Sequence, residues 1–189
     1  GGNGGFRIAG LLFSTDTSDP TISASVGGFG AGGGHSGNVN VGSAMDAISG
    51  TIQTTGDESH AVFAQSVGGG GGNGGFSVAG GVNKSPNVDF SVGGQGGKGG
   101  DAEAVKVFTA ANVSTQGASA NGIFAQSLGG GGGNGGFRIA GSATTDVKSV
   151  TASVGGFGGT AGNADEVDVN NSGQVITVGD QSIGLFAQS

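Results

Sequence analysis

Short stretches in which apolar and polar residues alternate recur along the chain, separated by runs of glycine. Clear examples are residues 6–8, 39–41 and 105–107. Alternation with a period of two places successive side chains on opposite faces of a β-strand. Glycine, asparagine, aspartate and serine separate these stretches, as turns require. The pattern therefore predicts many short β-strands, and no glycine-free stretch carries the apolar stripe of a helix.

A long repeat organises these stretches. The sequence GGNGGFRIAG at residues 1–10 recurs unchanged at 132–141 and with two substitutions at 71–80. A repeat of this length is typical of proteins built by stacking copies of one structural unit. Length differences fall between the recurring motifs, so the extra residues around 11–19 and 42–47 in the first repeat are predicted to be loops.

A second motif fixes the borders of the repeats. The tetrapeptide Phe-Ala-Gln-Ser begins at Phe63, Phe124 and Phe186, at spacings of 61 and 62 residues. We interpret the sequence as one continuous solenoid and as an excerpt of a longer chain. Its repeat units are 1–66, 67–127 and 128–189.

One repeat has too little apolar volume to form a core alone. Val, Phe, Ile and Leu supply 42 of the 189 residues, or 22%, barely above the ~20% below which chains usually fail to build a core. Stacking the repeats would cover the apolar side chains of each one with those of its neighbours and pair the backbones above and below. The sequence therefore predicts an all-β fold, a repetitive, β-helix-like β-solenoid with stacked Gly-rich arms.

Glycine supplies 48 of the 189 residues. Runs such as 68–72 and 129–133 lack Cβ atoms, so their backbones can approach closely. They could form ordered arms, including a polyglycine version of the extended three-residue helix, or loops. Asparagine recurs at one place in these runs, which favours ordered arms and a ladder of stacked amides. The asparagine ladder would be Asn3, Asn73 and Asn134, and a glutamine ladder would be Gln65, Gln126 and Gln188.

Phenylalanine at equivalent positions predicts ladders of rings through the stack. Two ladders are expected in the core, where each ring pair adds roughly 0.5–1.5 kcal/mol beyond its buried area. Carbohydrate stacking on exposed rings is the alternative. A third ladder, Phe29 and Phe157, is interrupted by Gln95, so we expect it to be partly exposed and able to contact a neighbouring chain. The two core ladders are Phe6, Phe76, Phe137 and Phe63, Phe124, Phe186.

Charge and reactive residues exclude several classes of function. The net charge is −7 and the six basic residues are scattered, which disfavours binding to nucleic acid or anionic membranes. No apolar run approaches the ~18 residues of a membrane span. Cysteine is absent, and the only histidines are His35 and His60. The dinucleotide-type glycine pattern at 28–33 precedes a predicted strand where a helix is needed. We predict no enzymatic activity and no cofactor.

The sequence contains a partial calcium-binding motif. Residues 96–101 partly match the Gly-Gly-x-Gly-x-Asp calcium repeat, but Glu103 replaces the next apolar residue and the equivalent arms lack the aspartate. A solvated turn is therefore the favoured interpretation, and a weak divalent-ion site is the alternative. The carboxylates that such a site could use are Asp101, Asp165 and Asp168.

Two motifs alternate through nearly the whole chain. One, at residues 56–75, joins Gly-Asp-x-Ser and Phe-Ala-Gln-Ser to a glycine run, and the other is a Ser-Val-Gly-Gly arm. Together they resemble the Gly-rich repeats of large bacterial autotransporter passengers (type V secretion). The resemblance implies export through the outer membrane by a C-terminal β-barrel and display at the cell surface. The middle repeat departs from it, because residues 117–120 replace Gly-Asp-x-Ser.

These observations predict a structural or adhesive segment of an extracellular bacterial surface fibre. It would act by its length and by lateral or end-to-end contacts with neighbouring repeats or other copies, and possible targets are surface glycans or proteins. Uncapped ends of a solenoid expose unpaired backbone groups, so we expect sticky ends. The alternative is a passive stalk that presents a separate ligand-binding or enzymatic head outside this sequence.

Overall fold

The structure, a computed structural model, describes residues 1–9, 13–14, 20–144 and 148–189. Within these ranges the chain is all-β and its strands form five sheets, each built from equivalent strands of the three repeats. All the strand pairs are parallel and in register, so the predicted repetitive β-solenoid with stacked arms is confirmed. No helix in the described ranges is long and apolar enough to cross a membrane.

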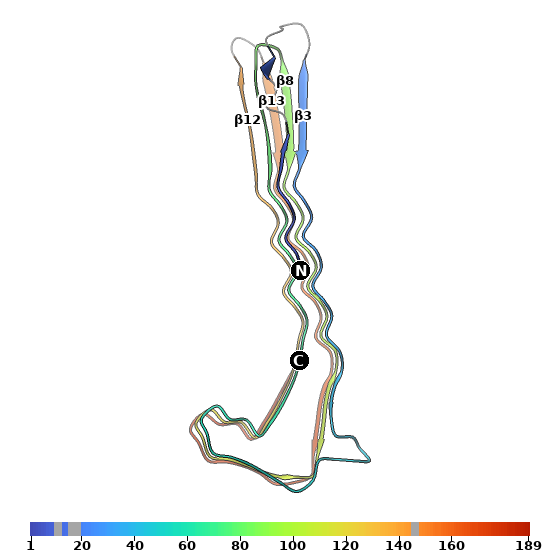
Figure 1. The fold of residues 1–189 in the computed structure, drawn as a ribbon, viewed down its shortest axis with the longest axis vertical. Helices are drawn as coiled ribbons and strands as arrows, with labels where there is room; N and C mark the ends of the chain where they lie inside the picture. The colour runs from blue at the N-terminus through green and yellow to red at the C-terminus, as the bar shows by residue number, and fades with distance from the viewer. Residues whose placement is uncertain (10–12, 15–19, 145–147) are drawn as a thin grey trace. The chain divides into compact units, whose positions relative to one another are not determined.

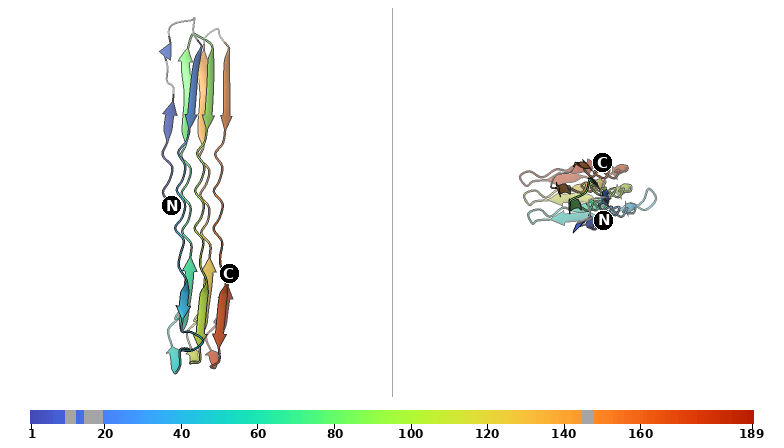
Figure 2. Two further views of the ribbon diagram at one scale, coloured as in Figure 1. Left: turned by 90° about the vertical axis from the view of Figure 1, so that its right-hand side faces the viewer. Right: turned by 90° about the horizontal axis from the view of Figure 1, so that it is seen from above.

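The chain forms two compact units, and each unit takes one segment from every repeat. In both units the three segments lie side by side in chain order (Figure 2). Unit 1 comprises Gly1–Gly34, Gly69–Gly100 and Gly130–Gly162. Unit 2 comprises His35–Gly68, Asp101–Gly129 and Asn163–Ser189.

Unit 1 contains two sheets, of which β3-β8-β13 is labelled in Figure 1. The other has the order β1-β7-β12, with β2 also paired to β7. Strand β2 shows that part of the predicted 11–19 loop is a strand, and the remainder of that prediction lies outside the described residues. The strands are β1 (Arg7–Ala9), β2 (Phe13–Ser14), β3 (Thr21–Val26), β7 (Ser77–Asn83), β8 (Asn87–Val92), β12 (Arg138–Thr144) and β13 (Ser149–Val154).

The glycine-rich arms of unit 1 are ordered and hydrogen-bonded backbone to backbone. The amides of Gly94 and Gly97, three residues apart, donate to Gly75 O at 2.9 Å and to Gly72 O at 2.7 Å. Between them, Gly96 donates to Phe157 O in the equivalent arm of the next repeat at 2.8 Å. A three-residue period is that of the polyproline II helix. The arms are therefore polyglycine-type extended helices, and the loop alternative is wrong.

This packing explains why two of every three positions in the middle arm, residues 93–100, are glycine. A Cβ on Gly97 would lie 2.0 Å from Ala31 O, a distance that no real side chain tolerates. A Cβ on Gly131, at the third position of its arm, would meet nothing within 4 Å. The third position faces solvent, and it is where Gln95 and Lys98 stand.

The interior of unit 1 is lined with small polar side chains. The hydroxyl oxygens of Ser77 and Ser91, on facing strands, lie 2.7 Å apart. Asp89 is fully buried and accepts hydrogen bonds from Asn87 Nδ2 at 3.1 Å and from the Ser23 hydroxyl. The arms that lead into these strands touch backbone to backbone, so the facing sheets lie too close for large side chains.

Unit 2 contains three sheets, β4-β9-β14, β5-β10-β15 and β6-β11-β16, around a small apolar core. Residues 42–47 lie between β4 and β5 and form no strand, as predicted. The core comprises Val62, Ala64, Val105, Val107, Ile123 and Ala125. The strands are β4 (Val39–Val41), β5 (Thr51–Thr54), β6 (Val62–Val67), β9 (Val105–Thr109), β10 (Asn112–Thr115), β11 (Ile123–Leu128), β14 (Val167–Asn171), β15 (Val175–Thr177) and β16 (Leu185–Gln188).

Candidate functional site

The recurring asparagines join one repeat to the next through the backbone. Asn73 N–H donates to Asn3 Oδ1 at 2.9 Å, and Asn134 N–H donates to Asn73 Oδ1 at 2.9 Å. The structure thus brings the three predicted residues into one ladder, although each side chain binds a backbone amide and not another side-chain amide. Asn3 and Asn73 each accept the amide of the next asparagine in the ladder, which is a structural role.

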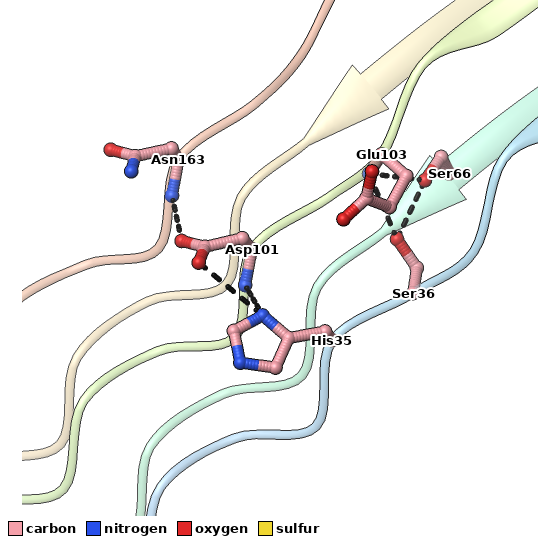
Figure 3. A network of polar contacts seen from close by, with 6 residues as sticks. All are labelled: His35, Ser36, Ser66, Asp101, Glu103 and Asn163. Atoms are coloured by element: carbon pink, nitrogen blue, oxygen red, sulfur yellow. Dashed lines mark hydrogen bonds and ion pairs between the residues drawn. The ribbon is translucent and has the colours of Figure 1, made fainter.

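A second ladder places histidine, aspartate and serine close together in unit 2 (Figure 3). Asp101 N–H donates to His35 Nδ1 at 3.0 Å, and Asn163 N–H donates to Asp101 Oδ1 at 2.7 Å. Asp101 Oδ2 also lies 3.3 Å from His35 Nδ1. The imidazole and the carboxylate therefore hold the backbone of successive repeats.

The serines of this region do not form a nucleophilic site with His35. The hydroxyl oxygens of Ser36 and Ser66 lie 2.6 Å apart, and Glu103 N–H donates to Ser66 Oγ at 3.0 Å and to Ser36 Oγ at 3.3 Å. In Figure 3 these serines converge on Glu103 while His35 points toward Asp101. A catalytic triad needs the histidine to accept the serine proton. Here serine and histidine each accept a hydrogen bond from a different backbone amide.

His60, the other histidine, also accepts a hydrogen bond from a backbone amide of the next repeat. Asn121 N–H donates to His60 Nδ1 at 3.0 Å, and Ile183 N–H donates to Asn121 Oδ1 at 2.8 Å. The His60 ring also stacks against Phe63 and Phe124, with centroid distances of 5.6 and 5.3 Å. An asparagine in the next repeat performs the same capping, so the position requires an acceptor and no imidazole.

The predicted phenylalanine ladders form, but their predicted place in the core is wrong. Phe63 is 54% exposed, because it points outward from β6 while its neighbours Val62 and Ala64 point into the core. Phe6 and Phe137, which directly precede β1 and β12 in unit 1, are exposed as well. The centroid distances are 5.2 Å for Phe6–Phe76, 4.9 Å for Phe76–Phe137, 5.1 Å for Phe63–Phe124 and 4.7 Å for Phe124–Phe186.

The stacked rings are poorly arranged to bind sugars. Neighbouring planes in the two complete ladders lie within 15° of parallel, so each ring face inside a ladder is covered by the next ring. The third ladder differs, because Gln95 separates Phe29 from Phe157 and these two rings are 69% and 66% exposed. Their predicted exposure is confirmed, and their faces are the ones left open for a ligand or a neighbouring chain.

The glutamines form the predicted ladder beside the phenylalanines of unit 2. Gln65 Nε2 donates to Gln126 Oε1 at 2.7 Å, and Gln126 Nε2 donates to Gln188 Oε1 at 2.5 Å. Because the side-chain amides pair with each other on an outward face, they tie the repeats together. The ladder thus adds side-chain bonds to those of the paired strands.

The candidate metal ligands are separate. Asp101 bonds to the Asn163 amide, Asp165 Oδ1 accepts Glu166 N–H at 2.7 Å, and Asp168 lies beside Lys106 in the β9–β14 register. Within the described ranges no group of three or more His, Cys, Asp or Glu side chains could hold a metal ion. The structure therefore offers these three carboxylates no shared site.

Unit 1 carries an apolar surface that the sequence did not predict. Ile8, Val78 and Ile139 align on the outer face of sheet β1-β7-β12 and, with Gly80 and Gly141, line a groove of about 390 Å³. The signal in the sequence was a small residue at alternate positions of the middle strand, Ser77, Ala79 and Gly81 in β7. It marked which side chains fit the narrow interior and, by alternation, which face outward.

A comparable surface covers the second sheet of unit 1. Ile22, Val88 and Val150 align in register across β3-β8-β13 and are all exposed. Contiguous exposed apolar side chains mark interaction surfaces on soluble proteins.

Comparisons with known proteins add little. No protein-family model matches the chain, and no curated protein matches it. Among solved structures, a springtail antifreeze protein from Granisotoma rainieri, a nine polyproline type II helical bundle, is 19% identical. That match covers 75% of this chain and 93% of the springtail chain, with a TM-score of 0.12. No conclusion about fold or function follows from so low a score.

Proposed function

We propose that this chain is a structural, self-associating segment of a surface fibre, which acts by its length and by contacts with other copies. The observation that carries the proposal is the pairing scheme. Each strand pairs with its equivalents in other repeats, so strands of the first and third repeats have one edge that pairs with no described strand. Open edges of parallel strands bind further strands.

The use of the polar residues supports a structural role. His35, His60 and Asp101 bind backbone amides of the following repeat, and Ser36 and Ser66 do the same for Glu103. A group already committed to a hydrogen bond with the backbone is a poor general base or nucleophile. The hydrogen bonds of these side chains hold neighbouring repeats together.

The outward apolar residues of unit 1 favour lateral contacts as well. Ile22, which is 73% exposed, continues into Val88 and Val150 on the neighbouring strands. Such a row loses hydration when it packs against a like surface, which stabilises association by roughly 25 cal/mol per Å² of apolar area. Lateral packing of fibres is therefore part of the proposal.

The proposed location is the outside of a bacterial cell, where the fibre would meet surface glycans or proteins of a host or of other cells. This part rests on the resemblance of the glycine-rich repeats to autotransporter passengers. Its test is protease treatment of intact bacteria that express the parent protein. Loss of the repeats without lysis supports surface display, and complete protection overturns it.

The test of self-association is sedimentation velocity of residues 1–189 over a range of concentration, with electron microscopy of the same samples. We expect mass to rise with concentration and elongated particles to appear. Val88→Lys should reduce side-by-side bundling, while Gln53→Lys, the same charge on an exposed residue of β5, should leave bundling unchanged. A wild-type monomer at every concentration would contradict the proposal.

A further inference from the structure

The outer face of sheet β3-β8-β13 is made of apolar side chains alone (Figure 1). Alternation along the strands turns three residues of each strand outward, and pairing in register aligns them in three rows across the sheet. The rows start at Ile22, Ala24 and Val26 and continue through their partners in β8 and β13. Asp89, the one charged residue of these strands, points to the other side and is fully buried. We call this surface the apolar face.

The apolar face is exposed at its centre as well as at its margins. Strand β8 is paired with β3 on one side and with β13 on the other, yet Val88 and Phe90 are each 41% exposed. The facing sheet of unit 1 covers the opposite side of β8, where Ser77 meets Ser91. The middle strand therefore presents apolar side chains to solvent whatever stands beyond either side of the sheet. Contiguous exposure of this kind marks an interaction surface.

The chemistry of the apolar face favours an apolar partner. None of its side chains carries a charge, a donor or an acceptor, so it has nothing with which to bind the hydroxyls of a sugar or the charges of a peptide. Packing it against another apolar surface would bury no unpaired polar side chain and would avoid the free-energy cost of doing so. Loss of hydration of the apolar area is then the driving force.

The spacing and size of the apolar face favour a second copy of this chain as that partner. Six-residue strands at ~3.3 Å per residue, three of them ~4.8 Å apart, give a face of roughly 300 Å². A standard stable interface uses about 800 Å² of each partner, so one such contact is weak. A partner with the same strand spacing repeats the contact at every stacked repeat, and its contact area grows with the length of the stack.

We infer that two copies of this chain associate side by side, apolar face against apolar face, with Phe90 at the centre of the contact. The inference rests on the proposed function and assigns its lateral contact to one sheet. Because both copies use the same surface, the interface has a two-fold axis and closes on itself. Sheets packed in this way lie ~10 Å apart with their side chains interdigitated.

Phe90 is the anchor of this contact. It is the largest side chain of the apolar face and lies in its middle row and middle strand, between Ala24 and Ala152. Its small neighbours leave room on both sides for side chains of the partner sheet. The rows that start at Ile22 and Val26 hold only valine and isoleucine, so they would let the two sheets slide. A buried aromatic residue at the centre of an interface supplies much of its affinity, and here it also fixes the alignment.

The test uses the absence of cysteine from this chain. Single cysteines in place of Val88, Val78 and Gln53 report on the apolar face, on the outer side of the other sheet of unit 1, and on unit 2. All three positions lie outside the buried cores, so the variants should fold, and circular dichroism checks this. A short bismaleimide cross-linker then joins cysteines that lie close together in two copies.

We expect Val88→Cys to give covalent dimers whose yield rises with protein concentration, and Gln53→Cys to give almost none. Adding Phe90→Lys to Val88→Cys should lower the dimer yield at least about 10-fold, because a charge then stands at the centre of the contact. The matched control is Gln53→Lys added to Val88→Cys, which places the same charge on unit 2 and should leave the yield unchanged.

The response to salt gives a second readout. Each copy has a net charge of −7, so two copies repel each other, while the apolar face itself is uncharged. Salt screens that repulsion and should raise the dimer yield of Val88→Cys. A yield that falls as salt is added would show an ionic contact and would overturn the inference.

The remaining outcomes separate this contact from others. An equimolar mixture of Val88→Cys with Val78→Cys, the latter carrying a tag that alters its mass, should give Val88→Cys homodimers. Predominant mixed dimers would show that the apolar face binds the other sheet, and overturn the inference. An uncross-linked Val88→Cys in a chain that still associates overturns it as well, and in both cases the proposed function stands. A wild type that sedimentation velocity finds monomeric at every concentration overturns both.

Discussion

Phe124 stacks face to face on Phe186, with ring centroids 4.7 Å apart and planes 13° from parallel, on the outward side of sheet β6-β11-β16. The pair shows that repeats can be joined by aromatic contact outside the core. The core of unit 2 is made of Val, Ala and Ile, and the phenylalanines lie outside it. The large rings therefore gain contact by covering one another.

Phe124→Ala should be among the most destabilising substitutions outside the core, where Phe124 is half-buried. It removes stacks with Phe63, Phe186 and His60, and at about 0.5–1.5 kcal/mol for each aromatic pair we expect the free energy of unfolding to fall by about 1.5–4.5 kcal/mol. Urea unfolding followed by circular dichroism measures it. The control is Phe29→Ala, which should cost less than about 0.5 kcal/mol. Equal losses would show that stacking contributes nothing.

Gly97→Ala tests the packing of the polyglycine arms. Its Cβ would lie 2.0 Å from Ala31 O, and the arm must shift to admit it. Overpacking of this kind costs about 1–3 kcal/mol or more, so the melting temperature should fall sharply. Gly131→Ala, with nothing near its Cβ, should be neutral or slightly stabilising because it restricts the unfolded chain. Similar melting temperatures for the two variants would mean that the arms are loose.

Gln95→Phe should complete the interrupted ladder. The ring would lie one strand spacing from both Phe29 and Phe157, whose backbones are joined through Gln95 and Gly96. Two new stacks of about 0.5–1.5 kcal/mol each, reduced by exposure, predict a gain of about 1 kcal/mol in the free energy of unfolding. Gln95→Leu is the control for added apolar area alone. If both substitutions stabilise equally, ring stacking is not the cause.

Calcium should leave the fold unchanged. Asp101 Oδ1 already accepts a hydrogen bond from the Asn163 amide, and Asp165 Oδ1 accepts one from the Glu166 amide. Neither of these oxygens is therefore available as a calcium ligand. A ligand that binds only the native state raises the melting temperature in proportion to its occupancy. We expect the same melting temperature in excess chelator and in millimolar calcium. A rise with calcium that Asp101→Asn abolishes would contradict this.

The sequence by itself determined the stacking and its register. Equivalent residues such as Phe63, Phe124 and Phe186 return at 61- and 62-residue spacings, and the structure pairs them directly. Identical neighbours in a parallel stack repeat the same contacts, so the period alone fixes which residues meet. The glutamine ladder followed from the same logic. The ordered glycine-rich arms could also be predicted, because residues 93–100 have glycine at two of every three positions.

Only the tertiary structure decided which face of each strand is inside. Alternation shows that Ile22 and Ser23 lie on opposite faces, but hydrophobicity would place Ile22 inside, and unit 1 does the reverse. Backbone contacts between the glycine arms hold its two sheets so close that Ser77 and Ser91 touch. Only small side chains fit that gap. In unit 2 the spacing admits valine and isoleucine, so the apolar face turns inward. The distance between sheets depends on contacts between arms remote in sequence, and for that reason no single strand could reveal it.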